Sequence, residues 1–94
     1  MVTVGDIYNY IDTFAPFHTA MGFDNVGLLV GGKHCPVTSV MVSMDITPKV
    51  ISEAVSQKAE LIISHHPVIF QPLKRLSPTD VPYLLVQNGL CAIA

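Results

Sequence analysis

The stretch that decides the fold is VTSVMVSMDITPKVISEAVSQKAELIIS, residues 37–64. Its first part, at about 38–45, is rich in β-branched and apolar residues and predicts a strand. A helix should follow, because Thr47 can cap its start and Pro48 suits the first helical position, where a missing N–H loses no intrahelical bond. A fully apolar strand at 60–64 comes next. This order predicts two parallel strands joined by a right-handed crossover.

The segments on either side extend the pattern. A helix is expected over residues 3–14, whose apolar side chains recur at helical spacing. A short apolar run between glycines predicts a strand at 27–30. Towards the C-terminus, a helix of about 79–88 should end with Gly89 as the residue just beyond its last turn. The apolar run at 90–94 then predicts a last strand.

The strands have few polar interruptions, which is typical of parallel strands that are buried on both faces. We therefore expect strands 38–45, 60–64 and 90–94 to lie side by side and point the same way. The predicted fold class is α/β, with a parallel or mostly parallel sheet and flanking helices. Residues 1–94 should form a single, partial domain.

The composition is unusually apolar for so short a chain. Half of the 94 residues are hydrophobic and 13% are charged, about half of the roughly 25% found in an average soluble domain. A membrane segment, an oligomer interface or a cut from a larger protein would each explain this. No uncharged apolar run reaches the 18 residues that suggest a membrane span, and the N-terminus lacks the pattern of a secretory signal. An interface or a fragment remains.

Several other functional classes lack their sequence signals. The net charge is −2, and Lys74 and Arg75 are the only adjacent basic residues, so no nucleic-acid footprint is expected. The glycines of GLLVGG do not have the spacing of a phosphate-binding loop. Cys35 and Cys91 are far apart and form no CxxC pattern, so we expect two free thiols in a cytosolic protein.

The residues that could carry chemistry follow the predicted strands. Ligands of open parallel sheets bind outside the carboxyl ends of the strands. Asp45 ends one such strand, and Ser64, His65 and His66 end the next. Adjacent residues of a regular strand point to opposite faces, but before Pro67 both histidines can turn towards one crevice, an arrangement that suits a dinuclear metal centre. The alternative is that both are hydrogen-bonded polar residues where a strand meets a loop.

Other candidate ligands are weaker. A metal site takes three or four protein ligands, and Asp45 and Asp24 are the carboxylates to consider. For Asp45 a turn residue that bonds to the backbone near the helix start is the preferred interpretation. His18 and His34 are expected to be exposed loop residues. Ser64 beside a histidine does not make a catalytic triad, because no nucleophile-elbow motif is present.

Three blocks of sequence carry a family resemblance. FDNVGLLVGG at 23–32, SMDITPKVISEAV at 43–55 and AELIISHHPVIF at 59–70 occur in this order. Together they resemble the N-terminal region of the Ngg-interacting-factor-three-like family, whose members carry the name GTP cyclohydrolase 1 type 2 homolog. The resemblance implies an α/β fold, a toroidal homohexamer, a cytoplasmic location and a dinuclear centre of divalent metal ions, zinc or iron, with His65 and His66 as ligands.

The resemblance also implies a function. Members are named for hydrolysis of GTP, so a metal-dependent hydrolase acting on a nucleotide-like small molecule is expected, with a non-catalytic metal-binding assembly or partner-docking module as the alternative. Members continue after a strand like GLCAIA (89–94) into an HTNLD-like segment that supplies an aspartate ligand, and further His and Glu ligands follow. We therefore expect this chain to be an N-terminal portion that holds two of the ligands and is inactive alone.

Overall fold

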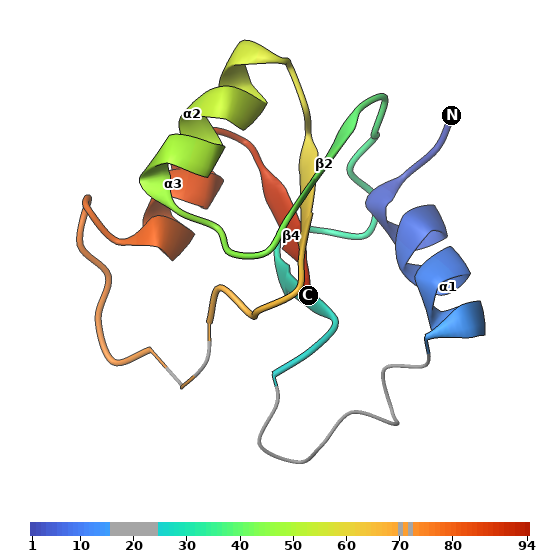
Figure 1. The fold of residues 1–94 in the computed structure, drawn as a ribbon, viewed down its shortest axis with the longest axis horizontal. Coiled ribbons are helices and arrows are strands. Elements are labelled where there is room, and N and C mark those ends of the chain that lie inside the picture. The colour runs from blue at the N-terminus through green and yellow to red at the C-terminus, as the bar shows by residue number, and fades with distance from the viewer. Residues whose placement is uncertain (16–24, 70, 72) are drawn as a thin grey trace.

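A four-stranded sheet forms the middle layer of the protein, as a computed structural model shows for residues 1–15, 25–69, 71 and 73–94. Helix α1 covers one face of the sheet, and helices α2 and α3 lie together on the opposite face (Figure 1). In chain order the elements are α1 (Val4–Phe14), β1 (Leu28–Val30), β2 (Val40–Ser43), α2 (Pro48–Ser56), β3 (Leu61–Ser64), α3 (Val81–Gln87) and β4 (Cys91–Ile93).

Threonine side chains cap the first two helices, and the cap at Thr47 was predicted. The Thr3 hydroxyl accepts a hydrogen bond from the Asp6 amide at 3.2 Å, and the Asp6 carboxylate accepts one from the Thr3 amide at 3.0 Å, which is a complete capping box. Thr47 caps α2 by accepting from the Val50 amide at 3.2 Å, with Pro48 in the first turn. In the described parts of the chain, no helix is long and apolar enough to cross a membrane.

The sheet order is β1-β4-β3-β2, and three of its strands are parallel. β2 pairs with β3 from Val40 opposite Leu61 to Ser43 opposite Ser64, and β3 pairs with β4 in the same direction. These pairings confirm the predicted α/β fold and the three adjacent parallel strands. β1 joins the far side of β4 in the antiparallel direction, so the sheet is mostly parallel.

Apolar side chains fill the space on both sides of the sheet. The cluster beneath α2 and α3 includes Ile51, Ile62 and Leu85, and the cluster beneath α1 includes Val4 and Leu61. Ile62 and Leu61 are adjacent in β3 and both fully buried, because successive strand residues point to opposite covered faces. β3 therefore contributes side chains to both cores, and the loop that carries the two histidines follows directly after it.

The prediction that strand 38–45 is buried on both faces is wrong. β2 is shorter than predicted and lies at the edge of the sheet, where its residues alternate between exposed and half-buried. Val42 is 77% exposed and Met44 is 62% exposed. The apolar composition of residues 38–45 and 60–64 led to the same prediction for both strands. The cluster under α1, however, contains residues of β3 and β4, such as Leu61 and Ile93, and none of β2.

Glu60 fastens the edge strand to its neighbour just before β3 begins. Its carboxylate accepts hydrogen bonds from the Thr38 amide at 3.0 Å, the Ser39 amide at 3.0 Å and the Thr38 hydroxyl at 2.9 Å. The donor bonds from Thr38 and then from Ser39 lower the pKa of the Glu60 carboxyl, because they stabilise its ionised form. This clamp fixes the start of β2 against β3.

Two glycines occupy backbone positions that other residues rarely adopt. Gly89 has φ +69° and follows α3, which confirms its predicted place beyond the last helical turn. Gly31 follows β1 with φ +101°. A Cβ at Gly31 would meet the Cys91 side chain, with its sulfur 2.2 Å away. The absence of a side chain at Gly31 therefore lets the chain after β1 pass directly over β4.

Candidate metal centre

The carboxyl ends of β2 and β3 lie next to each other, because Ser43 and Ser64 are paired at the last position of the parallel ladder. The hydrogen bonds continue past the strands into the following loop. The His65 amide donates to the Ser43 carbonyl at 3.1 Å, and the His66 amide donates to the Met44 carbonyl at 2.9 Å. Backbone hydrogen bonds therefore hold both histidines to β2, the outermost strand. They lie at the carboxyl ends of the strands, where ligands of parallel sheets bind.

Each strand ends in the same local turn. The Ser43 hydroxyl donates to the carbonyl of Asp45 at 2.7 Å, and the Ser64 hydroxyl donates to the carbonyl of His66 at 2.7 Å. In both cases the serine bonds two residues ahead, which is the pattern of serine-stabilised turns. These roles of Ser43 and Ser64 were not predicted from the sequence. The signal that could have indicated them is a serine at the last position of each strand, Ser43 and Ser64, because a serine hydroxyl can bond to the backbone two residues on.

The two imidazoles lie together although they belong to adjacent residues. Their ring centroids are 4.9 Å apart and the ring planes are inclined by 58°. Both histidines are exposed to solvent, as metal or substrate binding at this edge would require. The structure thus brings His65 and His66 side by side, as expected for residues that turn out of the strand; metal ligation by them stays a prediction.

Asp45 crosses from the end of β2 to the second histidine. Its Oδ1 lies 2.8 Å from Nδ1 of His66, and the side chains of this pair are 62% and 57% exposed. The interpretation of Asp45 as a residue that bonds to the backbone near the helix start is wrong, because Thr47 caps α2 and the Asp45 carboxylate binds an imidazole. The contact spans 21 residues of sequence, and only the parallel pairing of β2 with β3 creates it.

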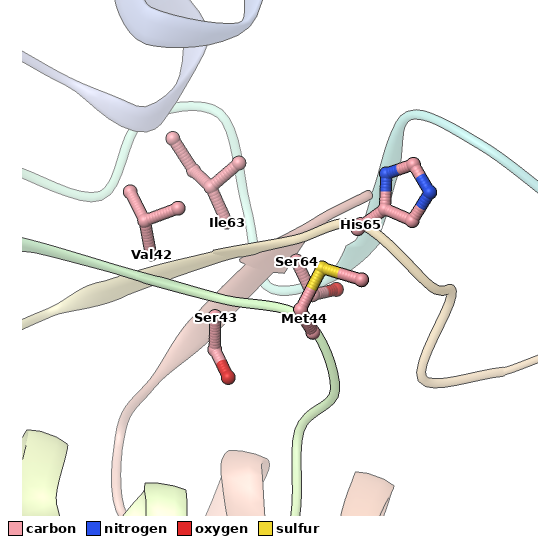
Figure 2. A pocket seen from close by; sticks show the side chains of 6 residues that line it. All are labelled: Val42, Ser43, Met44, Ile63, Ser64 and His65. Carbon is pink, nitrogen blue, oxygen red and sulfur yellow. The ribbon is translucent and has the colours of Figure 1, made fainter.

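An open hollow of about 510 Å³ lies beside the histidines and is lined by Val42, Ser43, Met44, Ile63, Ser64 and His65. Figure 2 shows His65, Val42 and Ile63 on the face of the sheet that α1 partly covers, with Ser43 on the other face. The exposed edge strand forms one wall of this hollow. A small molecule bound there would contact apolar side chains on one side and the His65 imidazole on the other.

The other predicted residues fall into two groups. His34 is exposed in a turn, as expected, and Cys35 and Cys91 are free thiols, which confirms that prediction. His18 and Asp24 lie outside the described residues. Across the described ranges, no group of three or more His, Cys, Asp or Glu side chains is gathered as a metal cluster.

Burial distinguishes Cys91 from an ordinary surface thiol. Cys91 is 4% exposed in β4, and this burial raises the pKa of its thiol, with the neighbouring Cys35 thiol adding to the rise. The more accessible Cys35 packs against the same cluster under α1. Because the thiolate is the nucleophile and the metal ligand, Cys91 is poorly suited to either role.

The donor set at the carboxyl edge fits a divalent metal ion. Two exposed imidazoles lie side by side, and a carboxylate already occupies Nδ1 of His66, which directs the other ring nitrogen of that residue away from the contact. Imidazole nitrogen is a good ligand for zinc and iron alike. Two histidines are fewer than the three or four protein ligands of a complete site, so the described residues can form part of a site.

These features define an α/β protein with a histidine pair at the carboxyl edge of a mostly parallel sheet. Residues 2–94 match the family model of Duf34/NIF3 (NGG1p interacting factor 3). The chain belongs to this family, in agreement with the resemblance of its sequence blocks.

Curated relatives and solved structures agree with this assignment. The chain is 41% identical over 94 residues to a GTP cyclohydrolase 1 type 2 homolog of Staphylococcus aureus (strain MRSA252), covering 97% of this chain and 26% of the relative. A protein of the same name from Clostridium perfringens is 44% identical over 68 residues, covering 72% of this chain and 26% of the relative. The chain thus spans about a quarter of the length of these relatives.

The solved structures share the architecture closely. A Staphylococcus aureus hypothetical protein superposes with a TM-score of 0.93 at 35% identity, covering 99% of this chain and 28% of that one. A Bacillus cereus protein related to NIF3 gives a TM-score of 0.91 at 31% identity, covering 98% of this chain and 26% of that one. Both comparisons confirm the α/β fold along nearly the whole chain.

Proposed function

We propose that this chain supplies the histidine pair of a divalent metal centre, and that the whole protein is a metal-dependent hydrolase of a nucleotide-like small molecule. The observation that carries the proposal is the position of His65 and His66, whose rings lie 4.9 Å apart at the carboxyl edge of the parallel sheet. The name GTP cyclohydrolase 1 type 2 homolog, which the curated relatives carry, supports the substrate class.

The residues of this chain have distinct parts in the proposal. His65 and His66 would hold the metal, zinc or iron, through ring nitrogens. A bound divalent ion acts as a Lewis acid that polarises a carbonyl or phosphoryl oxygen and lowers the pKa of water. The hollow beside His65, with Val42 and Ile63 in its wall, would receive part of the substrate. The homohexameric assembly and the cytoplasmic location stay predictions of the family resemblance.

Zinc binding by the chain tests the metal part of the proposal. Titration calorimetry with Zn²⁺ should show binding that a His65→Ala, His66→Ala double substitution removes. His34→Ala is the matched control, because His34 is an exposed histidine in a turn remote from this edge in sequence. Loss of outer partners alone typically costs 10–100-fold in metal affinity, so loss of both ligands should exceed that range. Zinc binding that ignores the double substitution would refute the ligand assignment.

The reaction requires a separate test. Because the chain spans 26% of its relatives, hydrolase activity is proposed for a protein of the relatives' length that contains these residues. Hydrolytic opening of the purine ring of GTP should release formate in a metal-dependent manner, and the double histidine substitution should abolish this release. Retention of zinc without formate release from GTP would reject the GTP reaction and leave the metal centre standing.

A further inference from the structure

We propose that Asp45 is a positioning residue of the metal centre, which holds the His66 imidazole with Nδ1 protonated and Nε2 free to bind the metal. The part of this inference that concerns metal rests on the proposed function, whereas the orientation of the ring does not. Asp45 would not itself bind the ion. Its carboxylate would act on the ligand, as carboxylates commonly do behind metal-binding histidines.

The hydrogen bond determines which ring nitrogen carries the proton. Oδ1 of Asp45 is 2.8 Å from Nδ1 of His66, within the range of a charge-assisted bond. An ionised carboxylate can only accept hydrogen bonds, so Nδ1 must be the donor. In a neutral imidazole that carries its proton on Nδ1, the lone pair is on Nε2. The contact therefore prepares Nε2 as the metal-binding atom before any metal arrives.

Both partners of this bond are fixed by their backbones. The Asp45 carbonyl accepts from the Ser43 hydroxyl at 2.7 Å, and the next residue, Ile46, is buried in the core under α2. The His66 amide donates to the Met44 carbonyl at 2.9 Å, and the His66 carbonyl accepts from the Ser64 hydroxyl at 2.7 Å. The carboxylate and the ring therefore meet because the two strand ends are locked together.

The second imidazole lies beside the first but lacks its carboxylate partner. The His65 ring centroid is 4.9 Å from that of His66, and no hydrogen bond to a carboxylate holds the His65 ring among the described residues. The two histidines are thus unequal: one is held by Asp45 and the other faces the hollow. We expect the Asp45 contact to matter for His66 alone, which gives the test an internal reference.

The tautomer of His66 in the metal-free protein tests the positioning role directly. Long-range proton–nitrogen NMR spectra, recorded at a pH at which imidazoles are neutral, report which ring nitrogen carries the proton. The wild-type protein should show Nδ1–H at His66, and Asp45→Ala should move His66 towards Nε2–H without changing His65. Because the wild-type protein and Asp45→Ala are both compared in the folded state, a purely structural role of Asp45 would leave the tautomer of His66 unchanged. A wild-type Nε2–H tautomer, or one that ignores the substitution, would overturn the proposal.

Zinc affinity tests the consequence for the metal. Outer-shell partners are worth 10–100-fold in affinity, and because the Asp45–His66 pair is more than half exposed we expect the lower end, roughly tenfold, for Asp45→Ala. Glu53→Ala is the control, since it removes an exposed carboxylate from α2 with the same change in charge. Asp45→Asn keeps an acceptor oxygen in place and should recover part of the loss.

The outcomes separate this inference from the proposed function. Absence of zinc binding in the wild-type protein would refute the metal centre, while the tautomer result would still decide whether Asp45 orients His66. Zinc binding that falls equally in Asp45→Ala and Glu53→Ala would assign the effect to net charge and overturn the positioning role.

Discussion

Replacement of Gly31 by alanine should destabilise the protein through a close contact inside the sheet. Gly31 has φ +101° and faces Cys91, so that an added Cβ would lie 2.2 Å from the Cys91 sulfur and 2.8 Å from its Cβ. The unfavourable backbone conformation alone costs about 1–2 kcal/mol for a residue with a Cβ. Cys91 is 4% exposed in the core and has little room to move, and overpacking of this kind costs about 1–3 kcal/mol.

The sum predicts a loss of about 2–5 kcal/mol in the free energy of unfolding, a large part of the roughly 5–15 kcal/mol that is typical of a domain. Gly89→Ala is the matched control, because Gly89 also has positive φ, +69°, and an added Cβ would meet nothing within 4 Å. It should cost only the backbone part, about 1–2 kcal/mol. Urea denaturation of both variants measures the difference through the shift of the midpoint at constant slope.

A second substitution tests the named contact. Cys91→Ala removes the sulfur that is 2.2 Å from the added Cβ but keeps its own Cβ at 2.8 Å, so the double variant should recover part of the loss. The two substitutions should therefore be non-additive, as expected for residues in contact. The reasoning is refuted if Gly31→Ala costs no more than Gly89→Ala, or if the effects of Gly31→Ala and Cys91→Ala simply add.

Two pH effects should also be measurable. The pKa of Glu60 is lowered by its hydrogen bonds from Thr38 and Ser39. Its contribution to stability is therefore present above the pKa of the unfolded carboxyl and is lost as the pH falls through the folded pKa. In urea unfolding across the acid range, the stability of Glu60→Gln should depend less on pH than that of the wild-type protein. The pKa of Cys91 is raised by burial and by Cys35, so stability should fall as the pH rises through that pKa. Cys91→Ala should weaken this alkaline loss, and iodoacetamide should modify Cys35 before Cys91.

Much of the fold could be predicted because local and global signals agree. Thr47 and Pro48 mark the start of α2, and the apolar residues after it form the fully covered strand β3. The exposure of Val42 could not be predicted, because composition does not say which strand lies at an edge. The antiparallel pairing of β1 depends on contacts between Leu28 and Ile93, 65 positions apart.

The position of the candidate site could be predicted from the sequence, but the contacts between its residues could not. His65 and His66 follow a buried strand, and strand ends of a parallel sheet share one edge. The role of Asp45 could not be predicted from its neighbours in sequence. Its carboxylate could bond either to the nearby backbone of a turn or to a side chain distant in sequence, such as His66. The register that pairs Ser43 with Ser64 decides between them. A carboxylate three residues before a proline-started helix would otherwise be read as a turn residue.

The backbone hydrogen bonds that continue past the ends of β2 and β3 couple the histidines to local opening of this strand pair. β2 is an edge strand with a single paired neighbour, and the amides of His65 and His66 are the last rungs that join that neighbour to it. Asp45 belongs to the β2 side of the same junction. Fraying of β2 from this end would release both amides to solvent exchange and withdraw the carboxylate from the ring in one event. The Asp45–His66 contact should therefore persist only as long as β2 stays paired with β3 at this end.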